Sequence, residues 1–426
     1  MKTINIGIIG LGTVGSGVIN LLDENKEIIK MRTNSIINIK TIMVYNLKKS
    51  RNIPKTYLDK IKSDESELFK DIDILIEVMG TIKKAKHFIE KALNSGIHVV
   101  TANKDLIALH GNELLNLAKK NKVNLLFEAS VCGGIPIIDM ITNSYQGNKI
   151  TSILGILNGT TNYILTLMEK ENVSFKKALK QAKSLGYAES NPKNDIEGYD
   201  SARKIAILAS MAFNSHISLS DIYVEGITNI DIQDILYAKD LGYKVKLLGM
   251  AKEKDGFIKV QVNPVFIPLS HPLANINDVY NGVYLEGDFF GPSMVYGLGA
   301  GSKPTASSIV GDLISIIKSI NSNTFTSCTY FRKLAVKNVL KTHSNFYIRM
   351  SVEDKPGSLA NISSILGNHN VSIYSVVQKK SIENYAELVM ITHKVLEASM
   401  YDSITVLKGM NVVKNINSII RVEDEY

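Results

Sequence analysis

Cysteine is scarce in this chain of 426 residues, which contains only Cys132 and Cys328. Two cysteines do not indicate a disulfide framework, and they fit a reducing compartment. We therefore expect a cytoplasmic protein rather than a disulfide-rich secreted one.

Long apolar runs are lacking as well. No stretch reaches about eighteen apolar residues, the length that a membrane-spanning helix needs. The N-terminus, MKTINIGIIGLGTVGSGVINLL, superficially looks like a signal peptide, but its glycines are regularly spaced and no small-residue cleavage site follows. We predict no membrane partner.

The chain also lacks an Arg/Lys-rich stripe with interleaved aromatic residues, although its formal net charge is +8. The lysines are dispersed and accompany much Asn and Ile, a bias that the base composition of a genome can also produce. We predict no nucleic-acid partner. Phosphate-bearing small molecules remain compatible with the positive charge.

Apolar and charged residues make up 45% and 21% of the chain, as in a soluble globular protein, and its length predicts two or three domains. Residues 1–130 are predicted to form a doubly wound parallel sheet, because short apolar strands alternate with helical patterns. The predicted strands are 4–9, 37–45, 72–78, 97–101 and 124–128, and the predicted helices are 14–22, 85–94 and 112–121.

The pattern changes near residue 145, so residues 131–330 are predicted to form a second α/β domain with its own sheet. Its predicted strands are 150–157, 243–251, 257–265 and 293–297, and its predicted helices are 160–169, 175–184 and 200–213. A further helix at 303–320 is expected to pack back onto the first domain.

A basic, weakly patterned segment at 331–344 is predicted to be a linker, followed by a third domain at 345–426. The expected elements of that domain are strand 346–352, helix 358–367, strands 371–378 and 385–392, helix 395–408 and strand 411–422. The order βαββαβ is that of a ferredoxin-like unit.

The motif GLGTVG follows the first predicted strand. Gly10 permits a tight turn, Gly12 allows the backbone to approach a pyrophosphate, and Gly15 permits close packing of helix on strand. The next helix would offer its N–H groups to the phosphates. The alternative is a glycine-rich turn without a ligand.

The segment VYNLKKSR lies at the end of the second predicted strand, where NAD sites carry an acid for the ribose hydroxyls. Here Asn46, Lys48, Lys49 and Arg51 are present and no acid is. Cations favour a 2′-phosphate, so we predict NADP, with NAD as a possible alternative. A solvated basic loop is the other interpretation.

Two further segments follow predicted strands of the first sheet. Lys104, in TANKDLIA, lies at the carboxyl edge of the sheet, where ligands bind in open α/β folds. Glu128, in FEASVCGGIPII, precedes glycines that force an irregular backbone, and exposed carbonyls with one carboxylate suit a hard cation. A surface lysine and a domain-crossing turn are the alternatives.

The stretch ESNPKNDIEGYDSARK carries four acids and three bases. Asp200 and Lys204 are four residues apart, so a helix places them on one face, and we expect Glu197 to join them. Taken alone, the stretch is compatible with an ordinary solvent-facing helix start.

Several motifs occur in the order found in homoserine dehydrogenases, which the chain resembles along nearly all of its length. They are GLGTVGSGV, TANKDLIA, EASVCGGIPII, GILNGTTNYIL, GYAESNPKNDIEGYDSARK and GAGSKPTA. The segment VEDKPGSLANISSILGNHNVSIYSVVQ resembles an ACT domain, an amino-acid-sensing module. The resemblance implies an NAD(P)-binding domain at 1–130, a catalytic and dimerisation domain at 131–330, and a regulatory ACT domain.

This resemblance implies an enzyme that interconverts L-aspartate 4-semialdehyde and L-homoserine with NAD(P)H, on the route to threonine and methionine. Lys204 would be the proton donor or acceptor at the substrate oxygen, and Asp200 would position its amine and the substrate. Glu189 and Asp195 would hold the amino end of homoserine. The resemblance also implies roles for Lys104, between cofactor and substrate, and for Gly186, at the edge of the pocket.

The same resemblance implies contacts to the cofactor and to a cation. Thr13 and Val14 would lie against the phosphates, beside Gly10, Gly12 and Gly15. The remaining expected cofactor contacts are Asn46, Lys48, Lys104, Gly186, Glu189 and Gly301, with Gly301 near the nicotinamide. A sodium or other monovalent cation would be held by Glu128 and the carbonyls of Val131, Gly133 and Ile135.

The chemistry supports this assignment. Hydride addition to an aldehyde leaves negative charge on oxygen, and a lysine in a partly desolvated pocket can supply the proton near neutrality. The zwitterionic substrate needs carboxylates for its ammonium, a role that suits Glu189 and Asp195. Lys104 and Lys204 could share the substrate carboxylate, and their division of labour stays open.

The departures from the family pattern are modest. Asn191 stands where an acid is more usual, and Cys132 occupies a position that is usually small and apolar. The ACT segment suggests threonine as an effector, with a role in assembly alone as the alternative. We expect a homodimer or homotetramer.

The sequence is compatible with two other interpretations. A non-enzymatic sensor built from Rossmann and ACT modules would bind its ligands without turnover and would not need the polar residues of 189–204. An ACT-linked 2-hydroxy-acid dehydrogenase would need a catalytic His with an acidic partner, and the eight histidines are scattered.

Overall fold

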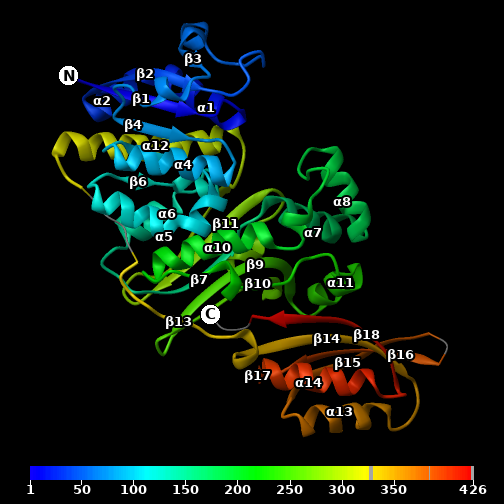
Figure 1. Cartoon of the computed structure of the whole chain (residues 1–426). Helices are drawn as coiled ribbons and strands as arrows, with labels where there is room; N and C mark the ends of the chain where they lie inside the picture. The colour runs from blue at the N-terminus through cyan, green and yellow to red at the C-terminus, as the bar shows by residue number, and fades with distance from the viewer. Residues whose placement is uncertain (326–329, 383, 424–426) are drawn as a thin grey trace. The chain divides into compact units, whose positions relative to one another are not determined.

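The computed structural model describes residues 1–325, 330–382 and 384–423, so Cys328 lies outside the described residues (Figure 1). The chain divides into two compact units. The first unit contains Met1–Thr151, Ala206–Leu219 and Leu285–Lys333, and the second contains Ser152–Ile205, Ser220–Tyr284 and Leu334–Tyr426. Within the described residues, no helix combines the length and apolar character that crossing a membrane requires.

A six-stranded parallel sheet forms the centre of the first unit, which confirms the predicted doubly wound fold. Its strand order is β3-β2-β1-β4-β5-β6, the order found in dinucleotide-binding folds. The strands are β1 (Lys2–Ile9), β2 (Ser35–Met43), β3 (Ile61–Lys62), β4 (Ile74–Glu77), β5 (His98–Thr101) and β6 (Leu125–Leu126). The helices are α1 (Thr13–Glu24), α2 (Lys26–Thr33), α3 (Glu65–Leu68), α4 (Ile82–Asn94), α5 (Lys104–Lys120) and α6 (Ile137–Asp139).

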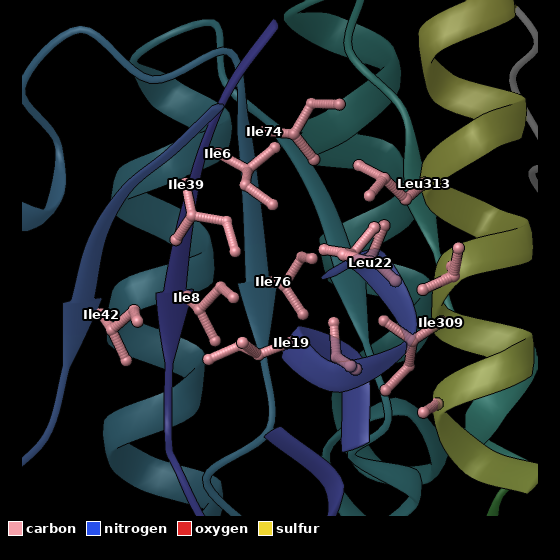
Figure 2. Packing of buried hydrophobic residues seen from close by; sticks show 14 of the residues in the cluster. Ile6, Ile8, Ile19, Leu22, Ile39, Ile42, Ile74, Ile76, Ile309 and Leu313 are labelled. Carbon is pink, nitrogen blue, oxygen red and sulfur yellow. The ribbon is translucent and has the colours of Figure 1, made fainter. Parts of the chain in front are cut away.

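Isoleucine fills the core of this unit, because β-branched side chains pack well on a pleated surface that is covered on both faces. Ile6, Ile8 and Ile76 of the central strands are fully buried. Helix α12 (Ser302–Ser322) turns a buried stripe that includes Ile309 and Leu313 toward the same cluster (Figure 2). The helix expected at 303–320 thus packs onto the first sheet.

A long antiparallel hairpin forms the centre of the second unit. Strands β9 (Tyr243–Lys254) and β10 (Phe257–Pro268) are joined by Asp255 and Gly256, both with positive φ. Asp-Gly in this conformation makes the two-residue turn that matches the twist of a hairpin. Strand β7 (Ile150–Ile156) pairs antiparallel with β9.

Further helices and strands lie between β6 and the C-terminal region. The helices are α7 (Gly159–Glu171), α8 (Phe175–Ser184), α9 (Lys193–Ile196), α10 (Tyr199–Ala212) and α11 (Ile232–Asp240). The strands are β8 (Tyr223–Val224), β11 (Tyr280–Gly287), β12 (Gly291–Leu298) and β13 (Ala335–Val336). Strand β13 lies in the segment 331–344 that was expected to be a linker, and it pairs with β10.

The C-terminal region has the predicted βαββαβ order. Its elements are β14 (His343–Glu353), α13 (Ser358–Asn368), β15 (Ile373–Ile382), β16 (Tyr385–Thr392), β17 (Val395–Leu396), α14 (Glu397–Lys408) and β18 (Val413–Val422). The sheet order is β18-β14-β16-β15, and both helices cover one face of it (orange to red in Figure 1). Strand β18 also pairs in parallel with β10, which joins this sheet to the hairpin of the same unit.

Candidate active site

The glycine motif forms a tight turn between β1 and α1. Gly10 has a φ of 100°, and a Cβ there would lie 2.6 Å from the carbonyl oxygen of Val78. A Cβ on Gly15 would lie 2.3 Å from the carbonyl oxygen of Gly10, whereas a Cβ on Gly12 would meet nothing within 4 Å. The turn is therefore closed where helix and strand pack and open at Gly12, where a ligand can approach the backbone.

The N-terminus of α12 lies beside this turn. Gly301, with a φ of 119°, precedes α12, and the hydroxyl of Ser302 donates a hydrogen bond of 2.9 Å to the carbonyl oxygen of Thr13. Two helices thus present their positive ends in one place, an arrangement that favours an anion. Of the residues predicted to contact a cofactor, Gly10, Gly12, Thr13, Val14, Gly15 and Gly301 are brought together here.

The basic loop after β2 is exposed and closed by its own hydrogen bonds. The side chain of Asn46 accepts a bond of 2.9 Å from the N–H of Lys48, and the guanidinium of Arg51 donates to the carbonyl oxygens of Asn46 and Lys49. Asn46, Lys48 and Arg51 therefore share one loop at the carboxyl end of the second strand, as the sequence predicted.

Sequence reasoning missed the acid at the end of β4. Glu77 is fully buried and accepts bonds from the hydroxyl of Thr101 at 2.6 Å and the N–H of Met79 at 2.7 Å. Burial raises the pKa of this carboxyl above its usual range. Its only signal was a single acid inside the apolar run ILIE. It stabilises the strand ends from which Lys104 follows, at the first turn of α5.

Glu128 accepts hydrogen bonds at both carboxylate oxygens. The N–H groups of Ile138 and Asp139 donate to it at 2.9 and 2.7 Å. Burial, with a smaller contribution from the charge of Asp139, raises the pKa of Glu128 to about 7, although the hydrogen bonds from the backbone lower it. The carboxyl of Asp312 accepts a bond from the N–H of Glu128, and burial together with the Glu128 charge raises the pKa of Asp312 well above its usual range.

The carbonyls expected to complete a cation site lie in the irregular segment after Glu128. Cys132 and Gly133 have φ values of 53° and 36°, which reverse the chain. The carbonyl oxygen of Gly133 accepts from the hydroxyl of Ser308, and that of Ile135 accepts from the N–H of Ile137. Within the described residues, no group of three or more His, Cys, Asp or Glu side chains is placed to hold a metal, so a cation here would depend on carbonyls.

Helix α10 carries a buried ion pair of the second unit. The amine of Lys204 lies 2.7 Å from a carboxylate oxygen of Asp200, one turn earlier, and donates a bond of 2.6 Å to the carbonyl oxygen of Leu157. Asp200 is 4% exposed and Lys204 8% exposed. The predicted pair therefore exists, but as a desolvated one rather than a solvent-facing one.

Asn158 links two of the predicted acids, and sequence reasoning gave it no role. Its side-chain amide donates to Asp195 at 2.7 Å and to Asp200 at 2.9 Å, while its oxygen accepts from the N–H of Thr161 and so caps α7. The only signal was an asparagine before GTT, which is typical of an ordinary helix N-cap. One residue thus orients Asp195, Asp200 and the start of α7.

The remaining residues of the stretch behave differently. Glu189 and Gly186 lie exposed in the loop after α8. Glu197 was expected to join the face of Asp200 and Lys204, and that prediction is wrong, because it ends α9 and pairs with Lys193. Gly198, with a φ of 86°, separates α9 from α10 and so prevents one continuous helix.

The predicted residues are thus divided between the two units. The glycine turn, the basic loop, Lys104 and the Glu128 group belong to the first unit, and Gly186, Glu189, Asp195, Asp200 and Lys204 belong to the second. The first offers backbone N–H groups suited to phosphates. The second offers a buried amine beside a carboxylate, which can exchange a proton with an oxygen.

Models of known families match most of the chain. A model described as homoserine dehydrogenase matches residues 136–314, and one described as homoserine dehydrogenase, NAD binding domain, matches residues 10–128. An ACT domain model matches residues 346–405.

Known proteins resemble the chain over all or most of its length. A homoserine dehydrogenase of Bacillus subtilis is 39% identical over 431 residues, covering 99% of both chains, and one of Helicobacter pylori is 40% identical over 426 residues, covering 99% of this chain and 100% of its own. The crystal structure of a homoserine dehydrogenase from Thiobacillus denitrificans has a TM-score of 0.93 at 35% identity, covering 100% of this chain and 99% of that one. A hyperthermophilic archaeal homoserine dehydrogenase mutant in complex with NADPH has a TM-score of 0.62 at 26% identity, covering 74% of this chain and 98% of its own.

Proposed function

Because the chain belongs to the homoserine dehydrogenase family and is an NAD(P)-dependent oxidoreductase, we propose that Lys204 carries the proton in its reaction. The reaction interconverts L-aspartate 4-semialdehyde and L-homoserine. One observation carries the proposal: the Lys204 amine is buried and lies 2.7 Å from Asp200.

In the direction of reduction, the aldehyde oxygen gains negative charge as the carbon is reduced. The ammonium of Lys204 donates a proton to that oxygen, and in the reverse direction the amine accepts it. Asp200 holds the amine in place and favours its charged form. The amide of Asn158 donates a hydrogen bond to Asp200 and restrains it. Asp200, which contacts Lys204, is therefore itself held in place by a hydrogen bond. When bound, the nicotinamide supplies or accepts the hydride.

We assign the two charged ends of the substrate to different groups. Glu189 and Asp195 receive the substrate ammonium, with Gly186 at the edge of the pocket, and Lys104 receives the carboxylate or faces the nicotinamide. The support is chemical type: a zwitterion needs both carboxylates and a cation. Asp195 is also oriented by Asn158, as a substrate-binding group requires.

The glycine turn fits a dinucleotide. The open backbone at Gly12 and the adjacent N-termini of α1 and α12 suit a pyrophosphate, with Thr13, Val14 and Gly301 beside it. Asn46 and Lys48 in the basic loop favour a ribose 2′-phosphate, so NADP is the preferred cofactor. The archaeal relative in complex with NADPH is consistent with this preference.

The segment around Glu128 fits a sodium or another monovalent cation. Its support is the buried carboxylate of Glu128 next to the carboxyl of Asp312: burial raises the pKa of both groups, the Glu128 charge raises that of Asp312 as well, and a bound cation would favour their ionised forms. The carbonyls of Val131, Gly133 and Ile135 would supply further oxygen ligands. Such a cation would neutralise the carboxylate and brace the segment between the sheet and α12.

The ACT region is assigned feedback regulation by threonine and a role in assembly as a homodimer or homotetramer. Strand β15 ends the sheet and exposes Tyr374, Val376 and Val377, so apolar side chains accompany an unpaired strand edge. The small number of cysteines favours a cytoplasmic location for the protein.

Steady-state kinetics test these assignments together. The purified protein should oxidise NADPH only when L-aspartate 4-semialdehyde is present, with a higher kcat/KM for NADPH than for NADH. L-threonine should lower the rate, and light scattering should give the mass of a dimer or tetramer. Binding of NADPH without turnover would instead support a sensor.

A further inference from the structure

A cavity of about 510 Å³ lies outside the candidate active site, between the β9–β10 hairpin and the strands β14 and β18 of the ACT region. Its walls belong to the second unit. Both the hairpin and the ACT sheet contribute, since Lys252 and Lys259 come from the former and His343 and Arg421 from the latter. The volume is that of an ordinary small-molecule site.

The charge on the wall is strongly one-sided. The cationic lining residues are Lys252, Lys254, Lys259, Lys337, Lys394 and Arg421, whereas the acidic ones are Asp255 and Glu423. A cavity lined by one sign of charge concentrates ions of the opposite sign. The bound species should therefore be an anion with more than one charge.

The innermost acids are already engaged. Glu423 accepts a bond of 2.5 Å from Lys252, and Glu397, behind the wall, accepts from Arg421 at 2.6 Å and from the hydroxyl of Ser344 at 2.7 Å. Lys259 instead donates to neutral acceptors, the carbonyl oxygen of His343 at 3.3 Å and the hydroxyl of Ser344 at 3.1 Å. Burial lowers the pKa of Lys259 to about 8, helped by the charges of Arg421 and Lys252 and opposed by those of Glu397 and Glu423. An anion here would relieve that cost.

A second observation concerns Gln261, which also lines the cavity. It is 3% exposed, and within the described residues its side-chain carbonyl oxygen has no hydrogen-bond partner. A buried acceptor without a donor costs about 1–3 kcal/mol, and a bound ligand or water that donates to it would remove that cost. The ligand should carry an O–H or N–H group beside its negative charges.

We propose that this cavity binds a small oxyanion of at least two negative charges that also carries a hydroxyl donor, with Lys259 facing the charge and Gln261 accepting the donor. Hydrogen phosphate groups and hydroxy-polycarboxylates share this chemistry. A ligand here contacts the β9–β10 hairpin and the ACT strands at once, so its binding stabilises their junction. The site is separate from the residues assigned to catalysis.

Calorimetric titration of the full chain tests the proposal. Inorganic phosphate and citrate are the two probes, in a buffer free of other oxyanions and with NADPH saturating, so that the glycine turn is filled. At least one probe should bind saturably. Tighter binding of phosphate assigns a phosphoryl ligand, and tighter binding of citrate assigns a polycarboxylate. If neither probe binds, the proposal is wrong.

Two variants locate the binding. Lys259→Met should weaken it about tenfold or more, because it removes a charge-assisted contact. Lys337→Met, which changes an exposed side chain at the rim and should fold normally, should weaken it about threefold. Lys408→Met changes an exposed lysine of α14 outside the cavity and should leave it unchanged. Wild-type affinity in both cavity variants, or equal losses in all three, would overturn the assignment.

Discussion

Two buried ion pairs of the second unit have similar distances and similar burial but differ in the chemistry of their cations. Lys204 and Asp200 lie 2.7 Å apart on one helix, and Arg421 and Glu397 lie 2.6 Å apart between β18 and α14. All four residues are nearly inaccessible to water. Burial and a short contact therefore do not by themselves distinguish the pair that we propose to be catalytic from a structural pair.

The difference lies in the cation and its surroundings. Arg421 donates to Glu397 through two nitrogens and to Glu225 through a third, and its guanidinium lies 4.5 Å from the centre of the Tyr223 ring. Burial lowers the pKa of Arg421, but the hydrogen bonds and charge of Glu397 outweigh burial and raise the pKa above its usual value, so the side chain remains charged at any working pH. Lys204 carries an amine that can lose a proton. A buried cation that can release a proton therefore suits a role in the reaction, whereas a buried cation that stays charged suits a structural role.

The largest expected effect is a loss of turnover when Lys204 of the first pair is replaced. Lys204→Ala should lower kcat by about 10²- to 10⁴-fold, because it removes the proposed general acid–base group. NADPH affinity, measured by fluorescence titration, should stay within about twofold of the wild type, since the cofactor residues are untouched. Lys193→Ala, in the exposed part of the same stretch, is the matched control and should retain activity. Near-normal turnover of Lys204→Ala would remove the role given to it.

The second prediction concerns the Arg421 pair and is a loss of stability. Arg421→Met should lower the free energy of unfolding by about 3–5 kcal/mol, because Glu397 would be left buried without its cation. Urea denaturation followed by circular dichroism measures the change. The double variant Arg421→Met/Glu397→Gln should recover much of the loss. A double variant no more stable than the single one would show that the packing of Arg421, rather than its charge, is what matters.

Sequence patterns anticipated the two sheets because their causes are local. Runs such as INIGII predicted buried parallel strands, and the four-residue spacing of Asp200 and Lys204 predicted a shared helix face. Their burial did not follow from spacing, since it depends on how Leu157 and the start of α7 close over α10. The error at Glu197 has a local cause that was visible in principle, because Gly198 interrupts the helix.

Other features depend on contacts between distant segments and left weak local signals. Asn158 reads as a helix cap from its neighbours alone, yet its amide reaches Asp195 and Asp200, 37 and 42 residues away. Helix α11 was missed although Asp231 and Asp234 form a capping box at its start. The cavity beside Lys259 needs a hairpin and two ACT strands to come together, which no spacing in the sequence encodes.

The third prediction asks whether titration alone marks a catalytic group. Burial lowers the pKa of His271 to about 4, below the unfolded value near 6.5, so the folded state keeps the ring neutral. The stability associated with this shift is present above about pH 6.5 and is lost as the pH falls through 4; the upper limit of the loss is about 3 kcal/mol. The ring accepts a bond from the N–H of Leu273, which is a structural role.

His271→Asn tests this by keeping a capping acceptor and removing the titration. Between pH 7 and pH 5 the wild type should lose more unfolding free energy than the variant, as measured by urea denaturation at each pH. The pH profile of kcat should be the same in both proteins. A shifted kcat profile would place His271 among the groups that control the reaction and would contradict its purely structural role.

The smallest expected effect concerns Asn158, which both caps α7 and orients two acids. Asn158→Ala removes the amide that orients Asp195 and Asp200 and also the cap of α7, so kcat/KM should fall about tenfold and stability by about 1 kcal/mol. Asn158→Ser keeps a capping hydroxyl but cannot reach both acids. It should therefore regain most of the stability and little of the activity, as judged by thermal unfolding and initial rates. Recovery of both properties in Asn158→Ser would mean that Asn158 acts only as a helix cap and that Asp200 positions Lys204 unaided.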